Sequence, residues 1–289
     1  MRDLTADRDL HDFSLNTGTV RFHGDFLAIV EAAKRHGISM LSPWREQIAG
    51  VGLETAVKAL SNGGFRLSGY CRGGLFPTDP ANRQAISDDN HRAVDEAVAL
   101  GAPCLVIVAG GLPQFTREGS APSKDIVASR AVIRDGLAEL LDYAEAAGMK
   151  LALEPLHPMM AAERCAVNTL RQALDLCDEL DPGRSRGLGI AVDVYHVWWD
   201  FEIHEQIRRM GADRLLAFHV CDWLVPTTDQ LLGRGMMGDG IIEIAKLRES
   251  IEALRADIPV EVEVLSTAWG ERPMDEVMRT AIERYRTAC

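Results

Sequence analysis

The stretch that decides the fold is Leu151-Ala-Leu-Glu-Pro-Leu-His157. Residues 150–153 are predicted to form a short buried strand, and Glu154 stands where that strand emerges. Pro155 cannot donate a hydrogen bond to a neighbouring strand, so it marks the end of the strand. The stretch therefore predicts a carboxylate at the C-terminal end of a strand, with a histidine shortly after it.

The same arrangement recurs three times further along the chain. Apolar runs over 187–192, 214–218 and 259–262 each close on a residue of a type that binds metals. Those closing residues are Asp193, His219 and Glu263. Four successive predicted strands that end in this way are the main indication of function.

The rest of the chain alternates short apolar runs with stretches of helical spacing. Further strands are expected at 13–16, 38–41, 65–70 and 104–108, and helices at 24–36, 43–62, 89–100 and 123–147 and near 168–180, 202–210, 241–256 and 273–287. Such alternation requires parallel strands, because each crossover needs a helix. About eight units in 289 residues favour one closed (β/α)₈ TIM barrel over an open sheet. The prediction is a single domain over 1–289, with 1–12 as a loose N-terminal arm.

Composition excludes several classes of function. The net charge of −12 argues against a nucleic-acid surface, which needs clustered Lys and Arg. No apolar run reaches the roughly 18 residues of a membrane span, and the charged N-terminus does not resemble a secretory signal. The six cysteines form no C-x-x-C pair, which indicates reduced thiols and a cytoplasmic protein. No phosphate-binding glycine motif is present.

Strand alternation gives a check on the predicted site. The residues two positions before each ligand should face the same side of their strand. They are Ala152, Ala191, Ala217 and Glu261. Three small side chains leave room for the ligands, whereas Glu261 is a buried carboxylate that needs a partner. Lys150 and Arg66 are the two candidates for that partner.

The four closing residues offer three carboxylates and one imidazole. That set suits Mn²⁺ best, with Mg²⁺, Co²⁺ or Zn²⁺ as alternatives. One such ion could act as a Lewis acid while a proton leaves the carbon next to a carbonyl. A single Glu or His at a strand end is usually solvated or structural, and only the succession of four favours a metal site.

Four segments, 153–157, 193–196, 218–222 and 260–263, resemble the xylose isomerase-like TIM barrel superfamily, and within it the sugar phosphate isomerase/epimerase group. The resemblance implies that Glu154, Asp193, His219 and Glu263 bind the metal. It further implies that Glu154 and Glu263 move the protons and that His196 contacts substrate. His157 departs from the ketose epimerases, which makes it a candidate base or substrate contact.

Three further residues are candidate substrate contacts. Arg164 could reach a substrate hydroxyl or phosphate, although a solvated arginine is an equal alternative. Trp44 follows a strand end and could form an apolar surface against a sugar ring. The glycine-rich segment 233–240 is either a flexible connector or a lid that brings Arg234 or Asp239 to the substrate.

The sequence thus predicts an isomerase or epimerase that acts on a keto-sugar or a related polyol through a metal-stabilised enediolate. One alternative is a lyase of the same family, which eliminates from a 3-keto-glycoside, C-glycosides included, or dehydrates an inosose. Another is a non-catalytic sugar-binding or partner subunit. The expected partner is a small sugar-like molecule, with no nucleic acid or membrane, and with assembly as a homo-oligomer or hetero-complex left open.

Overall fold

The computed structural model describes residues 10–76, 80–113 and 123–289. The chain divides into two compact units, one formed by the residues up to Tyr70 together with Ala217–Cys289, the other by Cys71–Leu216. Residues 1–9 of the predicted N-terminal arm lie outside the described part. That the chain acts as a single domain stays a prediction.

The first unit contains a run of parallel strands in the order β3-β2-β1-β11-β8. These strands are β1 (Phe13–Asn16), β2 (Met40–Ser42), β3 (Arg66–Leu67), β8 (Leu215–Val220) and β11 (Val260–Val262). A separate antiparallel pair joins β9 (Asp222–Trp223) to β10 (Arg234–Gly235). The register pairs Phe13 with Val260 and Glu261 with His219.

Helices connect the strands of this unit. They are α1 (Phe26–Arg35), α2 (Arg45–Val51), α3 (Leu53–Gly63), α9 (Ile244–Glu252), α10 (Thr267–Gly270) and α11 (Met274–Ala288), with a 3₁₀ turn η1 (Thr17–Val20). Helix α1 shows how the sequence sets them. Asp25 caps its first turn by accepting from the N–H of Ala28 over 2.9 Å, and Ile29, Val30 and Ala33 form its buried face.

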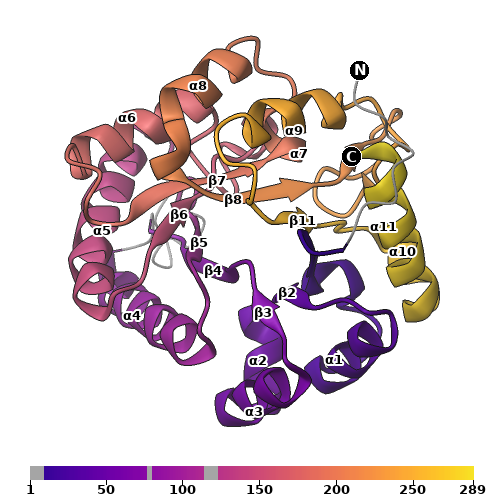
Figure 1. The fold of residues 1–289 in the computed structure, drawn as a ribbon. Coiled ribbons are helices and arrows are strands. Elements are labelled where there is room, and N and C mark those ends of the chain that lie inside the picture. The colour runs from indigo at the N-terminus through magenta and orange to yellow at the C-terminus, as the bar shows by residue number, and fades with distance from the viewer. Residues whose placement is uncertain (1–9, 77–79, 114–122) are drawn as a thin grey trace. The chain divides into compact units, whose positions relative to one another are not determined.

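The second unit contains four neighbouring strands, β4 to β7. They are β4 (Tyr70–Gly74), β5 (Leu105–Val108), β6 (Leu151–Leu153) and β7 (Leu188–Asp193). The helices are α4 (Arg83–Leu100), α5 (Ile126–Ala147), α6 (Leu170–Leu180), α7 (Val194–Val197) and α8 (Ile203–Arg214), with 3₁₀ turns η2 (Pro80–Asn82) and η3 (Pro158–Met160). Helices α4, α5 and α6 lie on the outer side of β5 and β6 (Figure 1).

Two local predictions are wrong. The helix expected over 43–62 is broken into α2 and α3 at Gly52, whose φ of 85° does not continue a helix. The single strand expected over 65–70 is instead two strands, β3 and β4, and β4 continues to Gly74. A Cβ atom at Gly74 would lie 2.1 Å from the carbonyl oxygen of Val108, so glycine permits this strand to approach β5 closely.

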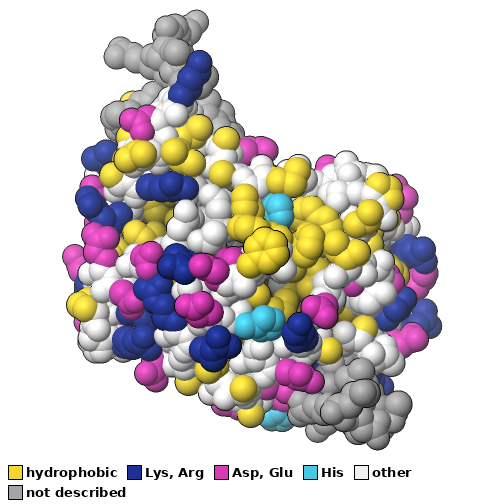
Figure 2. Space-filling view, turned by 90° about the horizontal axis from the view of Figure 1, so that it is seen from above, with side chains coloured by type: hydrophobic (Ala, Val, Ile, Leu, Met, Phe, Trp, Pro, Cys, Tyr) yellow, Lys and Arg dark blue, Asp and Glu magenta, His cyan; other side chains and the backbone are white. Residues whose placement is uncertain are grey.

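The surface carries mixed charges. On the face shown in Figure 2, Lys and Arg side chains are interspersed with Asp and Glu, and hydrophobic side chains gather in the middle of the view. Among the described helices, none has both the length and the apolar character that crossing a membrane requires. All six cysteines are buried and free of disulfides.

Candidate metal centre

Glu154 directly follows strand β6. Its backbone N–H donates to the carbonyl of Ile107 in β5 over 3.0 Å, which extends the parallel ladder one residue beyond the strand. Pro155 comes next and has no N–H, so the ladder ends there as the sequence predicts. The side chain of Glu154 is buried at this strand end.

Asp193 is the last residue of β7 and is fully buried. One of its oxygens accepts from the N–H of Tyr195 over 2.9 Å, so the side chain caps the short helix α7. The other oxygen lies 3.5 Å from Nε2 of His196. The turn from strand to helix therefore fixes how this carboxylate is directed.

His219 and Glu263 come from neighbouring parallel strands. His219 lies within β8, and Glu263 follows β11 and donates its N–H to the carbonyl of Val220 over 3.0 Å. Nδ1 of His219 lies 3.9 Å from Oε2 of Glu263, and both side chains are buried. The register of β8 and β11 thus brings an imidazole and a carboxylate together.

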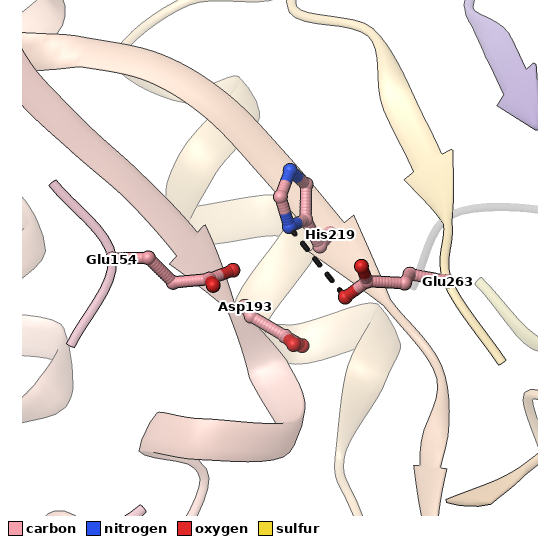
Figure 3. A group of neighbouring side chains, drawn as sticks. All are labelled: Glu154, Asp193, His219 and Glu263. Carbon is pink, nitrogen blue, oxygen red and sulfur yellow. Dashed lines mark ion pairs between the residues drawn. The ribbon is translucent and has the colours of Figure 1, made fainter. Parts of the chain in front are cut away.

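The four residues predicted as ligands form one buried group. Glu154, Asp193, His219 and Glu263 each offer one ligand atom, and these atoms all lie within 4.8 Å of one another (Figure 3). Buried carboxylates need a compensating charge or donors. Three oxygen ligands and one nitrogen match the preferences of Mn²⁺ and related ions, so the residues fit the ion that the sequence predicts.

Two donors hold the carboxylate of Glu263. Nη1 of Arg234 lies 3.0 Å from Oε2, and Nδ2 of Asn16 donates to Oε1 over 3.1 Å. Arg234 is itself buried and also donates to the backbone carbonyl of Glu263 over 3.3 Å. Both oxygens of this carboxylate therefore have a defined neighbour, and the side chain is held in one orientation.

Backbone amides set the tautomers of two histidines. The N–H of His157 donates to Nδ1 of His196 over 3.2 Å, and the N–H of Met159 donates to Nδ1 of His157 over 3.3 Å. A ring nitrogen that accepts carries no proton, so the neutral form of each ring bears its proton on Nε2. Burial lowers the pKa of His157 below its ordinary value of 6.5, which favours this neutral form.

A match to the model of a known protein family shows which family the chain belongs to. The model described as "Xylose isomerase-like TIM barrel" matches residues 28–288, nearly the whole chain. The chain belongs to this family. The predicted TIM barrel and the predicted family are thereby confirmed.

Three similar proteins give the comparison its range. The inosose isomerase of Bacillus subtilis (strain 168) is 25% identical over 154 residues, which spans 51% of this chain and only 51% of that protein. The structure of protein SMc04130 from Sinorhizobium meliloti 1021 is 48% identical, covers 97% of this chain and 99% of that one, and has a TM-score of 0.91. The IOLI protein, solved with a bound zinc atom, is 18% identical, covers 95% and 96%, and has a TM-score of 0.79.

Trp44 and Arg164 differ in how they are held in this xylose isomerase-like chain. The indole N–H of Trp44 donates to Oδ1 of Asn16 over 2.6 Å, so this polar group is already used within the protein. Only the ring of Trp44 remains to contact a substrate. Arg164 is half-buried in the turn after η3, and its contact with substrate stays a prediction.

The glycine-rich segment 233–240 is tied to a buried carboxylate. Asp222 accepts hydrogen bonds from the N–H groups of Gly238 and Gly240 over 2.9 Å each, and from Ile242 over 3.0 Å. Asp239 pairs with Arg284 over 2.9 Å. The segment is therefore anchored rather than a flexible connector, and Arg234 reaches Glu263 from strand β10.

Asn16 and Ser68 were not predicted as part of the site. Asn16 ends β1, so the rule that found the other strand-end residues could have found it. The partner of Glu261 was predicted wrongly, since Asn16 and Ser68 donate to its carboxylate over 2.7 and 2.8 Å. Arg66 instead donates to a backbone carbonyl over 2.8 Å. Nη1 of Arg234 also donates to Sγ of Cys221 over 3.7 Å.

Proposed function

We propose that this protein is a divalent-metal-dependent isomerase or epimerase that acts on a keto-sugar or a related polyol. The observation that carries the proposal is the buried group formed by Glu154, Asp193, His219 and Glu263, whose ligand atoms lie within 4.8 Å of one another. Membership of the xylose isomerase-like family supports it.

The four residues would hold one ion, with Mn²⁺ as the first candidate and Mg²⁺, Co²⁺ or Zn²⁺ as alternatives. The zinc atom in the IOLI structure supports a divalent ion in this family. When bound, the ion would polarise adjacent substrate oxygens as a Lewis acid and so acidify the neighbouring C–H bond.

Glu154 and Glu263 would move the proton. One carboxylate takes it from the carbon next to the carbonyl, and the other returns a proton to the same or the adjacent carbon. A base must be held in place to act efficiently. Arg234 and Asn16, each within 3.1 Å of one oxygen of Glu263, provide that support.

His157 is better suited to donate a hydrogen bond than to accept a proton. Its Nδ1 accepts from the N–H of Met159, so the ring of the neutral form carries its proton on Nε2. In the proposed reaction His157 would donate from Nε2 to a substrate oxygen as charge develops there. His196 has the same tautomer, and its Nε2 is directed to Asp193 at 3.5 Å, so it would steady that carboxylate as well as contact substrate.

Incubation in deuterated water tests the proposal. The Mn²⁺-loaded protein is given a panel of ketoses and 3-keto-glycosides, and the products are analysed by NMR and mass spectrometry. Deuterium at a carbon next to the carbonyl of an isomeric sugar is the expected result. A chain that binds Mn²⁺ and leaves every compound of the panel unlabelled and unchanged would instead favour a non-catalytic sugar-binding subunit.

Elimination is the second candidate, and the tautomer of His157 suits it as well. A hydrogen-bond donor beside the substrate could stabilise charge on a leaving oxygen while the C–H electrons form the double bond, and the carboxylate that took the C–H proton could give it to the leaving group. A 3-keto-glycoside would then lose its aglycone, or an inosose would lose water. Release of aglycone or water with no isomeric sugar would select this reaction.

A further inference from the structure

A fourth carboxylate, that of Glu261, lies beside the candidate ligand His219. Glu261 is in the middle of β11, only 1% exposed, and its register partner on β8 is His219. Its side chain is two residues before Glu263 and therefore on the same face of the strand. Its place on β11, opposite His219, relates Glu261 to the site.

Hydrogen-bond donors orient this carboxylate. Nδ2 of Asn16 donates to Oε1 over 2.7 Å, and Oγ of Ser68 donates to Oε2 over 2.8 Å. Oγ of Ser14 lies 2.7 Å from Oγ of Ser68. Because Ser68 gives its proton to Glu261, Ser14 supplies the donor for Ser68. The carboxylate of Glu261 is thus held by Asn16 of β1 and by Ser68, which follows β3.

The ring of His219 has a different carboxylate near each nitrogen. Nε2 lies 3.5 Å from Oε1 of Glu261, and Nδ1 lies 3.9 Å from Oε2 of Glu263. Metal-binding histidines commonly direct their second N–H to a carboxylate, which fixes the tautomer and the ring orientation. The nitrogen on the side of Glu263 then keeps its lone pair for the ion.

We propose that Glu261 is the positioning residue for His219, and that Nδ1 is consequently the nitrogen that coordinates the metal. This inference rests on the proposed function, since it needs the ion. Asn16 is part of the same arrangement, because its amide bridges Glu261 and Glu263 while its Oδ1 accepts from Trp44 and from the N–H of Gly18. One amide thus sets the spacing of two carboxylates.

The affinity of the chain and its Glu261 variants for Mn²⁺ tests the proposal directly. The full chain is stripped of metal and titrated with Mn²⁺ by calorimetry, for wild type, Glu261→Leu and Glu261→Gln. Loss of a carboxylate that orients a metal-binding histidine typically costs 10–100-fold in affinity, and we expect a weakening of about that size for Glu261→Leu. Glu261→Gln should lose less, because its amide oxygen can still accept from Nε2.

A second readout separates positioning from a merely structural role. In ¹⁵N-histidine-labelled protein loaded with ¹¹³Cd²⁺, coupling to the metal should appear at Nδ1 of His219, with the signal assigned by its loss in His219→Gln. Glu252→Gln is the matched control, because Glu252 is also a largely buried glutamate, paired with Arg248 over 2.6 Å on α9. It should keep wild-type affinity.

The outcomes distinguish this inference from the proposed function. A wild-type chain that binds none of Mn²⁺, Mg²⁺, Co²⁺ or Zn²⁺ would end both. Wild-type binding of Mn²⁺ with coupling at Nε2, or a folded Glu261→Leu variant within twofold of wild type, would overturn the role of Glu261 alone. If Glu261→Leu does not fold, Glu261→Gln and Ser68→Ala decide, and both should bind Mn²⁺ more weakly than Glu252→Gln.

Discussion

The two ends of strand β8 carry buried polar groups that are satisfied in different ways. Arg214, immediately before the strand, is fully buried. Its guanidinium donates to the carbonyls of Leu188, Cys177 and Asp181 and to the carboxylate of Asp178, all between 2.7 and 3.0 Å. The protein itself thus supplies acceptors for this charge.

At the other end, His219 belongs to a group of three carboxylates and one imidazole whose ligand atoms converge. Arg234 of the chain pairs with one of these carboxylates, and under the proposed function a divalent cation from outside the chain would balance the others. In TIM barrels the C-terminal ends of strands carry the chemistry and the N-terminal ends carry stability. Arg214 lies at the N-terminal end of β8 and His219 near its C-terminal end. Mutations of Arg214 should therefore affect stability, and mutations near His219 should affect the proposed chemistry.

Glu263→Gln should have the largest effect, and that effect should fall on catalysis and on binding of the ion that Glu263 would hold. Removing a general base typically lowers the rate by 10²–10⁴-fold, so we expect kcat to fall by about that factor. Circular dichroism and the thermal midpoint of the metal-free chain should stay close to wild type. Near-wild-type turnover in this variant would remove Glu263 from the proposed chemistry.

Arg214→Met should act on stability alone. Nη1 of Arg214 lies 4.0 Å from the buried carboxylate of Asp181, and removing one member of such a pair costs about 3–5 kcal/mol of unfolding free energy, measured by urea denaturation. The remaining folded protein should keep its kcat at low temperature. Arg209→Gln is the control, since Arg209 also contacts Asp178, at 2.8 Å, but is about one third exposed, and should cost less than about 1 kcal/mol. Equal losses would contradict the distinction between buried and surface pairs.

Divalent metal should stabilise the chain through the end of β8 that carries His219. At a free Mn²⁺ concentration 100 times the dissociation constant, the free energy of unfolding should rise by about 2.7 kcal/mol. His219→Gln and Asp193→Asn should abolish most of that increase, whereas Arg214→Met should keep it. An equal increase in Asp193→Asn would show that the ion binds elsewhere.

The smallest effect concerns pH and His157. Because burial lowers the pKa of His157, the unfolded chain binds its proton more readily than the native state. Stability from this residue is therefore complete above about pH 6.5 and decreases as the pH falls below that value. Urea unfolding at pH 7.5 and 5.5 should show a larger loss for wild type than for His157→Gln. Equal losses of unfolding free energy in wild type and in His157→Gln would show that protonation of His157 does not affect stability.

Much of the candidate site could be predicted because it lies at strand ends. Glu154, Asp193, His219 and Glu263 each close an apolar run, and parallel strands gather such residues at one edge. The hydrogen bonds that hold the site residues in place could not be predicted in this way. Asn16 and Glu261 are 245 positions apart, and nothing local to either indicates the other. A buried Glu suggested a cationic partner, whereas neutral donors from Asn16 and Ser68 satisfy it.

The same distinction explains the errors in the fold. Alternating strands and helices were predictable from periodicity, because burial of one face dictates the pattern. The break at Gly52 depends on its positive φ of 85°, whereas the strand at Tyr70–Gly74 depends on close packing between segments. At Gly74 the decisive neighbour is Val108, 34 positions away, so glycines that resemble a loop in the sequence form a strand in the structure.

The anchoring of segment 238–242 by Asp222 has a kinetic consequence. Three backbone amides donate to this one carboxylate, so their exchange with solvent deuterons should be slow both with and without a bound sugar. Substrate association should accordingly be governed by diffusion rather than by ordering of this segment. The temperature dependence of the association rate should then be shallow, as expected for encounter with a pre-formed surface.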